Sequence, residues 1–397
     1  MTLQLESSPI GGLLKWNSLF VLSLLSCALL QPLKAGAQAA AAKPAPDVIV
    51  FTNGDQLTGT LERADGDSFL FKSDIVGEVT VSADKIKELH AGGKFVALKN
   101  NEKITRTSKT PANITYADSV ITIADQSSSP TPEAVPVKDL AHLVDSATYA
   151  KEVTGNPGIW YGWKGAVTGG ITLIESTSYG ETFTAAVNLI RAVPTVSFLP
   201  PRTRSTINVL ETYGKLTQPT VPQTTPPTPD QVAKTNIFHA DAEHDKYFTP
   251  KLYVLVGASF DHNFSQGLNL QQIYGGGIGW TVIKTPVQEF DVKADVHYER
   301  QNFQPPTPNT NLIGSSFTEL YHRNLPAKII FTESGTFIPA WNDTNAYSAI
   351  FAAGLQLPTY KRLSLNVNVL DNYLNNPAIG FNKNSFQFIT GVLYTLK

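Results

Sequence analysis

The chain has 397 residues, of which only 16% are charged, and its formal net charge is -2. This balance excludes the broad basic surface that holds nucleic acid, so we expect no nucleic-acid partner. The length allows one small domain followed by one large sheet structure. Because residues suited to pleated sheets and turns are abundant, while helical periodicity is hard to find after the N-terminus, we predict an all-β protein.

The first residues have the features of an export signal. Lys15 supplies positive charge, residues 19–30 form an apolar run, and Ala35-Gly36-Ala37 offers a small-x-small cleavage site. We therefore predict a signal peptide over residues 1–37 and a linker over 38–46. The apolar run is shorter than the roughly 20 residues that a membrane-spanning helix takes. Cleavage would remove Cys27, the only cysteine, so we expect neither disulfides nor thiol chemistry in the mature chain.

Residues 47–146 are predicted to form a small periplasmic β-domain. The stretch DVIVFTNGDQLTGTL places an Asn53-Gly54-Asp55 turn between two apolar runs, a hairpin signal because its central positions can adopt positive φ. SFLFKS and EVTVS follow as strands, and together they predict a curled sheet similar to an SH3-like barrel. A weaker second copy follows, with residues 95–99, NITYADSVITIA and VPVKDLAHLV as its strands. Residues 126–136 are expected to form a loop, and residues 147–158 a linker.

From residue 159 to residue 397 the chain yields twelve candidate strands, most of them longer than the usual mode of about 5–6 residues. They start near Trp160, Glu181, Arg204, Lys234, Lys251, Asn269, Glu289, Gly314, Lys328, Asn345, Arg362 and Ser385. Short connections, such as residues 248–250 and 284–286, alternate with longer ones such as LNNPAIGFNKN. This alternation is typical of transmembrane barrels. The connection over residues 192–202 is an exception, because it is long where a short turn is expected.

The stretch EFDVKADVHYER, residues 289–300, alternates apolar and polar side chains almost without error. Alternation by itself fits a sheet over a protein core as well as a sheet in lipid. Hydrocarbon requires every backbone polar group to be paired, which forces a closed, even-stranded sheet. Aromatic residues near strand ends, among them Trp160, Trp280 and Trp341, suit the two membrane interfaces. We therefore predict a 12-stranded antiparallel transmembrane β-barrel over residues 159–397, with its apolar sides toward lipid.

The polar faces of these strands predict a hydrated lumen lined by charge. The candidate lumen-lining residues are His239, Asp241, Glu243, Asp291, Lys293, Asp295, His297 and Glu299. Barrels of about eight strands fill with side chains, and those of about 16 to 18 strands hold open water. A barrel of twelve strands therefore leaves open whether the lumen is a narrow pore or is plugged.

The same residues also invite an enzyme hypothesis. Some outer-membrane barrels carry hydrolase sites in which a histidine acts as base on a serine, here a serine such as Ser259. No nucleophile motif surrounds Ser259, so a barrel-borne hydrolase is a minor alternative, and we assign no catalytic residues. His239 and His244 fall on opposite strand faces, so no metal site is predicted. The glycine-rich run 275–279 opens no helix and predicts a bend in the sheet rather than a phosphate site.

Several stretches together resemble a known family. DVIVFTNGDQLTGTLERADGDSFLFKSDIVGEVTV, FDHNFSQGLNLQQIYGGGIGWTVI and the C-terminal NSFQFITGVLYTLK are similar to domain of unknown function family 481, a bacterial family described as salt-induced outer-membrane proteins. The resemblance implies an outer-membrane barrel and supplies no catalytic residues, no cofactor and no metal. It also implies outer-membrane lipid and the barrel-assembly machinery as partners.

We therefore expect a non-enzymatic protein of the bacterial outer membrane, exported by a signal peptide. Its predicted role is that of a narrow passive channel or of an envelope-structural protein, with peptidoglycan or a periplasmic protein as a candidate partner of residues 47–146. The alternative is a secreted or surface β-sandwich that binds polysaccharide through its aromatic side chains. The two differ in whether the apolar strand faces lie outside a closed barrel or inside a two-layered core.

Overall fold

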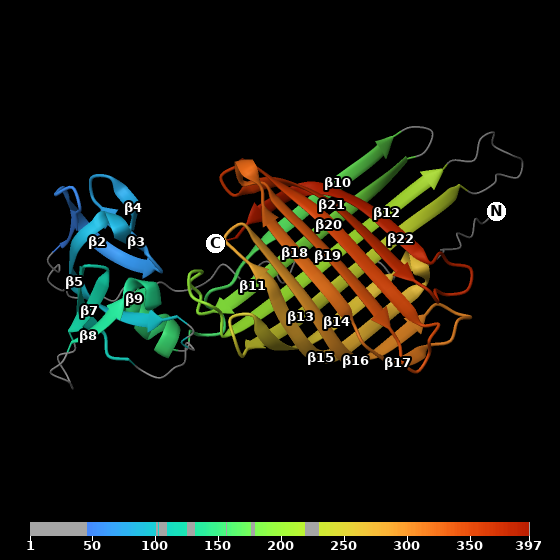
Figure 1. Cartoon of the computed structure of the whole chain (residues 1–397). Helices are drawn as coiled ribbons and strands as arrows, with labels where there is room; N and C mark the ends of the chain where they lie inside the picture. The colour runs from blue at the N-terminus through green and yellow to red at the C-terminus, as the bar shows by residue number, and fades with distance from the viewer. Residues whose placement is uncertain are drawn as a thin grey trace, which may run out of the picture. The chain divides into compact units, whose positions relative to one another are not determined.

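The computed structural model describes residues 46–396, except residues 101, 103–108, 125–131, 156, 176–178 and 219–229. The predicted signal peptide and nearly all of the linker behind it lie outside the described residues. The strands of two sheets make up 71% of the described residues (Figure 1). The first lies within residues 47–145, and the second, within residues 164–395, forms the barrel.

The first sheet has nine strands. They are β1 (Asp47–Phe51), β2 (Gln56–Asp65), β3 (Ser68–Ser73), β4 (Gly77–Ser82), β5 (Ile86–Lys99), β6 (Ala112–Ala117), β7 (Val120–Ala124), β8 (Glu133–Pro136) and β9 (Leu140–Asp145). The hairpin predicted around Asn53-Gly54 joins β1 to β2, with Gly54 at a φ of 90°. Phe69, Phe71 and Tyr116 are among the fully buried side chains of its core. The apolar strand faces of this domain therefore pack against one another.

This sheet consists of two similar units. In each unit a pair of hairpin-linked strands leads to a 3-10 turn and a closing strand: η1 (Ala83–Lys85) precedes β5, and η2 (Val137–Asp139) precedes β9. The first part of β5 pairs with β1, and its last part pairs with β9. This is the arrangement that the weaker second sequence copy predicted. The predicted loop over residues 126–136 is wrong at its end, because residues 133–136 form β8, which pairs with β7.

The predicted linker over residues 147–158 is partly helical. It begins with α2 (Ser146–Thr148) and η3 (Tyr149–Thr154), and the Asp145 side chain caps them by accepting from the backbone N–H groups of Ala147 and Thr148 at 3.0 and 2.9 Å. Tyr149 and Val153 are buried on this segment. An N-cap and two spaced apolar residues were readable in the sequence, but the segment is too short for its periodicity to stand out.

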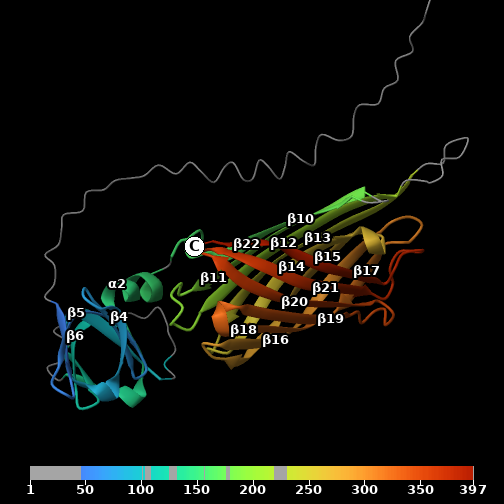
Figure 2. The same ribbon diagram turned by 90° about the horizontal axis from the view of Figure 1, so that it is seen from above.

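The barrel strands are long and antiparallel. They are β10 (Lys164–Glu175), β11 (Tyr179–Val193), β12 (Thr203–Gln218), β13 (Gln231–Tyr247), β14 (Leu252–Asn263), β15 (Leu268–Lys284), β16 (Gln288–Phe303), β17 (Thr310–Gly314), β18 (Phe317–Asn324), β19 (Ile330–Pro339), β20 (Tyr347–Tyr360), β21 (Leu363–Leu374) and β22 (Asn384–Thr395). Each strand pairs with its neighbour in sequence, and β22 pairs with β10 to close the sheet (Figure 2). β17 and β18 share one position beside β16, so the wall has twelve positions.

The predicted strand starts agree with these bounds to within about four residues, with one exception. The eighth strand, predicted to start at Gly314, is two strands separated by an interruption of the ladder at Ser315 and Ser316, with the same register to β16 on both sides. Within the part of the chain that is described, no helix has the length and apolar character needed to cross a bilayer.

The outer wall of the barrel is apolar. Large exposed side chains on it include Ile171, Phe183, Val256, Ile278, Val296, Tyr298, Phe317, Phe386, Phe388 and Val392. Val296 of β16 is 52% exposed, whereas His297 beside it is 3% exposed and faces inward. The apolar faces of the barrel strands thus point outward, opposite to those of the first sheet. The alternative of a β-sandwich is wrong, because the sheet is closed and these faces do not pack on a second layer.

The long connection over residues 194–202 packs on the helical segment that precedes the barrel. Thr195 donates from its backbone N–H and its hydroxyl to the Glu152 carboxylate at 2.8 and 2.9 Å. Arg202 donates to the Glu152 carbonyl at 3.1 Å, and Leu199 is buried with Tyr149 and Val153. The exceptional length of this turn therefore serves to hold the segment at residues 146–154.

Candidate functional site

The barrel encloses a cavity of about 910 Å³ between its walls. We call the end of the barrel with the short connections at residues 248–251 and 285–287 the turn end, and the end with residues 304–309 and 375–383 the loop end. Six of the eight candidate lumen-lining residues line this cavity: His239, Asp241, Glu243, Asp291, Lys293 and Asp295. His297 and Glu299 face the same side but are almost fully buried behind their neighbours.

The turn end of the lumen holds a cluster around Arg204 of β12. Its guanidinium donates to Asp245 of β13 at 2.7 Å and, through two nitrogens, to one oxygen of Asp291 of β16 at 3.0 Å. It also lies over the rings of Tyr247 and Tyr253, 5.7 and 5.0 Å from their centroids, and Tyr253 donates to Asp291 at 3.1 Å. We call these five residues the Arg204 cluster. The four partners of Arg204 are buried, with Tyr253 0% exposed, and the Arg204 side chain itself is 12% exposed.

Further charged contacts follow toward the loop end. Lys293 of β16 forms an ion pair with Glu243 of β13. His239 lies between two carboxylates, with Nδ1 2.6 Å from Asp261 and Nε2 2.9 Å from Asp241. Two ring N–H donors satisfy this arrangement, which leaves no free ring nitrogen to act as a base.

Asp295 and His297 stabilise the interruption between β17 and β18. Asp295 accepts from the backbone N–H and the hydroxyl of Ser316 at 2.9 and 2.8 Å, and from His297 Nδ1 at 2.7 Å. Backbone groups outside the regular ladder need other hydrogen-bond partners. The two residues therefore have a structural contact that their strand pattern did not predict.

The loop end is covered by an interlocked set of loops. Glu299 accepts from Gln271 and Gln301 at 2.5 and 2.6 Å. Beyond it, the buried Gln266 donates to the carbonyls of Asn372 and Lys383 at 3.0 and 2.8 Å. Apolar side chains fill the space beside these contacts: Leu268, Phe303, Leu374, Ala378 and Phe381.

The two sides of the lumen differ in charge. β12 to β16 contribute eight carboxylates, namely Asp241, Glu243, Asp245, Asp261, Glu289, Asp291, Asp295 and Glu299, against three cations, Arg204, Lys293 and Lys284, the last 3.9 Å from Glu289. Apart from His322 and Glu333, the other wall presents neutral groups to the cavity, among them Thr332, Ser334, Ser348, Asn366, Asn368 and Asn372. Before the histidines and Glu333 are counted, these eight carboxylates therefore exceed the three cations by five charges.

The hydrolase hypothesis finds no support in the positions of these residues. Ser259 faces the lumen opposite Asp241, while both nitrogens of His239 contact carboxylates. His244 lies on the outer face with Nδ1 2.8 Å from Ser205, as its opposite parity to His239 predicts. Among the described residues, no histidine nitrogen lies within hydrogen-bonding distance of Ser259, which the general-base role requires.

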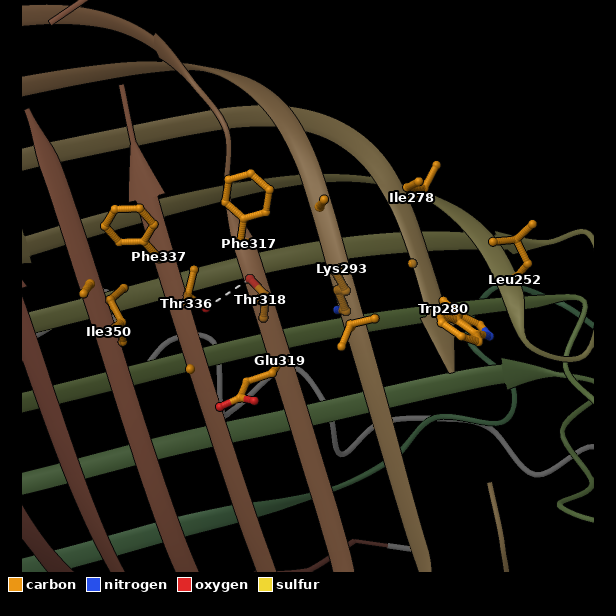
Figure 3. A pocket seen from close by; sticks show the side chains of 15 residues that line it. Leu252, Ile278, Trp280, Lys293, Phe317, Thr318, Glu319, Thr336, Phe337 and Ile350 are labelled. Carbon is orange, nitrogen blue, oxygen red and sulfur yellow. Dashed lines mark hydrogen bonds between the residues drawn. The ribbon is translucent and has the colours of Figure 1, made fainter. Parts of the chain in front are cut away.

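A groove of about 730 Å³ runs along the outer wall from the start of β14 to β20. Figure 3 shows Phe317 and Phe337 projecting side by side, with Ile278, Trp280 and Leu252 further along the groove. Small residues, among them Ala294, Gly335 and Ala349, form part of its lining. Glu319 is the one carboxylate in this lining, and among the described residues it has neither an ion-pair nor a hydrogen-bond partner.

The closed sheet, the apolar outer wall and the polar lumen define the class of outer-membrane-type β-barrels. A family model described as "Protein of unknown function, DUF481" matches residues 223–396, from just before β13 to the end of β22. This match confirms the family resemblance predicted from the sequence.

Two solved structures are similar to the chain. The translocator domain of autotransporter NalP from Neisseria meningitidis shares 10% identity over 58% of this chain and 87% of that chain, with a TM-score of 0.29. The CymD monoaromatic hydrocarbon channel shares 8% identity over 76% of this chain and 85% of that chain, with a TM-score of 0.27. No curated protein matches the chain in sequence.

Proposed function

We propose that the protein resides in the bacterial outer membrane and forms a narrow passive channel that favours cations. The observation that carries this proposal is the charge of the lumen, in which eight carboxylates face three fixed cations. A passage lined by an excess of one charge concentrates ions of the opposite charge and excludes those of the same charge. The wall opposite supplies hydroxyl and amide groups that can replace part of an ion's hydration.

The apolar outer wall supports the membrane location. A closed sheet leaves no unpaired edge, and exposed side chains such as Val296 and Phe388 are stable in hydrocarbon rather than in water. On this proposal, membrane lipid covers the outer wall, the barrel-assembly machinery inserts the chain, and residues 47–145 lie in the periplasm. The role is non-enzymatic, which agrees with the occupied nitrogens of His239.

The test is a planar-bilayer recording with the purified full chain in a potassium chloride gradient. We expect small conductance steps and a reversal potential displaced toward the potassium equilibrium potential. Asp241→Asn combined with Asp261→Asn should reduce this displacement, because both carboxylates face the lumen. Asp74→Asn is the matched control, since Asp74 is exposed in the first sheet.

Two results would count against the proposal. An anion-selective current would overturn the cation preference while leaving a channel. Current-free membranes that demonstrably contain folded protein would remove the channel itself and favour the envelope-structural role.

A further inference from the structure

Arg204 and Lys293 reach across the lumen to residues on strands that are not adjacent to their own. β12 and β16 are separated by β13, β14 and β15, so with a strand spacing of about 4.8 Å the path along the wall is about 19 Å. Arg204 nevertheless reaches from β12 to Asp291 of β16. Lys293 of β16 likewise reaches Glu243 of β13. Both contacts span the interior of the barrel between non-adjacent strands, and both lie in the half of the barrel nearer the turn end.

The glycine run of β15, residues 275–279, places no side chains on the lumen side and so leaves room for these contacts across the lumen. Gly275, Gly277 and Gly279 are the lumen-facing members of the run, because they pair with His297, Asp295 and Lys293. A Cβ atom on Gly279 would lie 2.2 to 2.5 Å from the Tyr253 ring and hydroxyl, well inside contact distance. Side chains at this position would displace Tyr253, which holds both Arg204 and Asp291. The run is therefore suited to a crowded crossing as well as to a bend in the sheet.

The groups around Arg204 come from three other strands. They are Asp245 and Tyr247 of β13, Tyr253 of β14, and Glu289 and Asp291 of β16, with Glu289 3.6 Å away. Asp245 and Asp291 are 1% and 3% exposed. One oxygen of each of these two carboxylates has no hydrogen-bond partner among the described residues. Asp245 and Asp291 are thus nearly closed to solvent, and together with the 37% exposed Glu289 they carry more negative charge than Arg204 alone neutralises.

We propose that Arg204 closes the turn end of the lumen and sets the conductance and charge selectivity of the channel. This inference rests on the proposed channel function. Arg204 fills the crossing and places a fixed positive charge in the path of cations. Its removal leaves Asp245, Glu289 and Asp291 facing a wider passage, so cation flow increases.

The experiment compares the wild-type chain with Arg204→Ala and with the charge-balanced variant Arg204→Ala/Asp291→Asn, which removes one charge of each sign. The balanced variant is needed because removing Arg204 alone leaves buried carboxylates uncompensated, which can unfold the protein. Heat-modifiable gel migration first establishes that each barrel is folded. We expect single-channel conductance to increase about twofold or more in both variants. The reversal potential should move further toward the potassium value in Arg204→Ala only.

A second measurement needs no current. In a chain whose native Cys27 is replaced by serine, Ser259→Cys places a thiol in the lumen beyond the Arg204 cluster. Its rate of labelling by a small charged thiol reagent should increase several-fold when the balanced substitution is added. Ser265→Cys at the loop end is the control, and its rate should not change.

The outcomes separate the two proposals. If the folded variants conduct as the wild type does and Ser259→Cys labels at an unchanged rate, Arg204 does not close the lumen. If labelling accelerates while no protein conducts, the closure is supported and the channel proposal fails. Increased conductance together with faster labelling supports both.

Discussion

A charge placed on the outer wall distinguishes lipid from water as the solvent of that wall. Val296 lies at the middle of β16 and is 52% exposed. Val287, in the short turn that precedes the same strand, is 51% exposed. Val296→Arg and Val287→Arg therefore introduce the same group at equal exposure and different depth. In a membrane, arginine on the lipid face costs about 2–4 kcal/mol at the midplane and about 0–1 kcal/mol near the interfaces.

The assay is equilibrium urea unfolding of the barrel in lipid vesicles, followed by tryptophan fluorescence. We expect Val296→Arg to lower the free energy of unfolding by about 2–4 kcal/mol and Val287→Arg by about 1 kcal/mol or less. Val296→Leu should change it little and controls for packing. If both arginine variants unfold at the wild-type urea concentration, the outer wall faces water, and the membrane location is refuted.

Three further predictions concern single polar groups. Glu319→Leu should raise the free energy of unfolding in vesicles by about 1 kcal/mol, because it removes an unpaired carboxylate from the outer wall; an unchanged or lower value would contradict the lipid exposure of the groove. Asp47→Asn should cost about 1.5–3 kcal/mol, read from hydrogen exchange of the first sheet, because the buried Asp47 carboxylate accepts two backbone N–H groups at 2.6 Å. Burial lowers the pKa of His142 despite Asp65 nearby, so above about pH 6.5 its contribution is complete, and stability falls below that pH as the unfolded chain takes up the proton. His142→Gln should flatten this dependence in the same exchange measurement, and an equally steep dependence would exclude His142 as its source.

The barrel strands were predictable because their period is local. Every second residue is apolar over residues 290–298 of β16 and over residues 238–242 of β13, and lipid on one side of the wall with water on the other imposes this pattern. The interruption of the ladder at Ser315 and Ser316 was not predictable, because the Asp295 side chain that stabilises it comes from a neighbouring strand. The sequence signal was only a break in alternation.

The site was predictable on single strands but not across them. Parity placed His239, Asp241 and Glu243 toward the lumen, where they line the cavity. Arg204 was missed, because its partner Asp291 is four strand positions away and nothing local marks the two residues as neighbours. The sequence did contain one indication of its position. The alternation of its strand places Arg204 on the lumen side, close to the turn end. The glycines of β15 were interpreted as a bend, whereas their inward positions also admit the Tyr253 ring.

The two sheets are stabilised in different ways. As a result, the residues of the barrel that determine what crosses the lumen differ from those that determine its stability. In the first sheet, Phe69 and Phe71 form an apolar core, so a change inside it costs stability directly. In the barrel, the backbone ladder is closed and the apolar groups face outward, while the interior consists of exchangeable polar contacts. Substitutions that preserve the charge balance of the lumen can therefore change what crosses it with little effect on folding. Substitutions on the outer wall should do the opposite, altering insertion and stability while leaving selectivity unchanged.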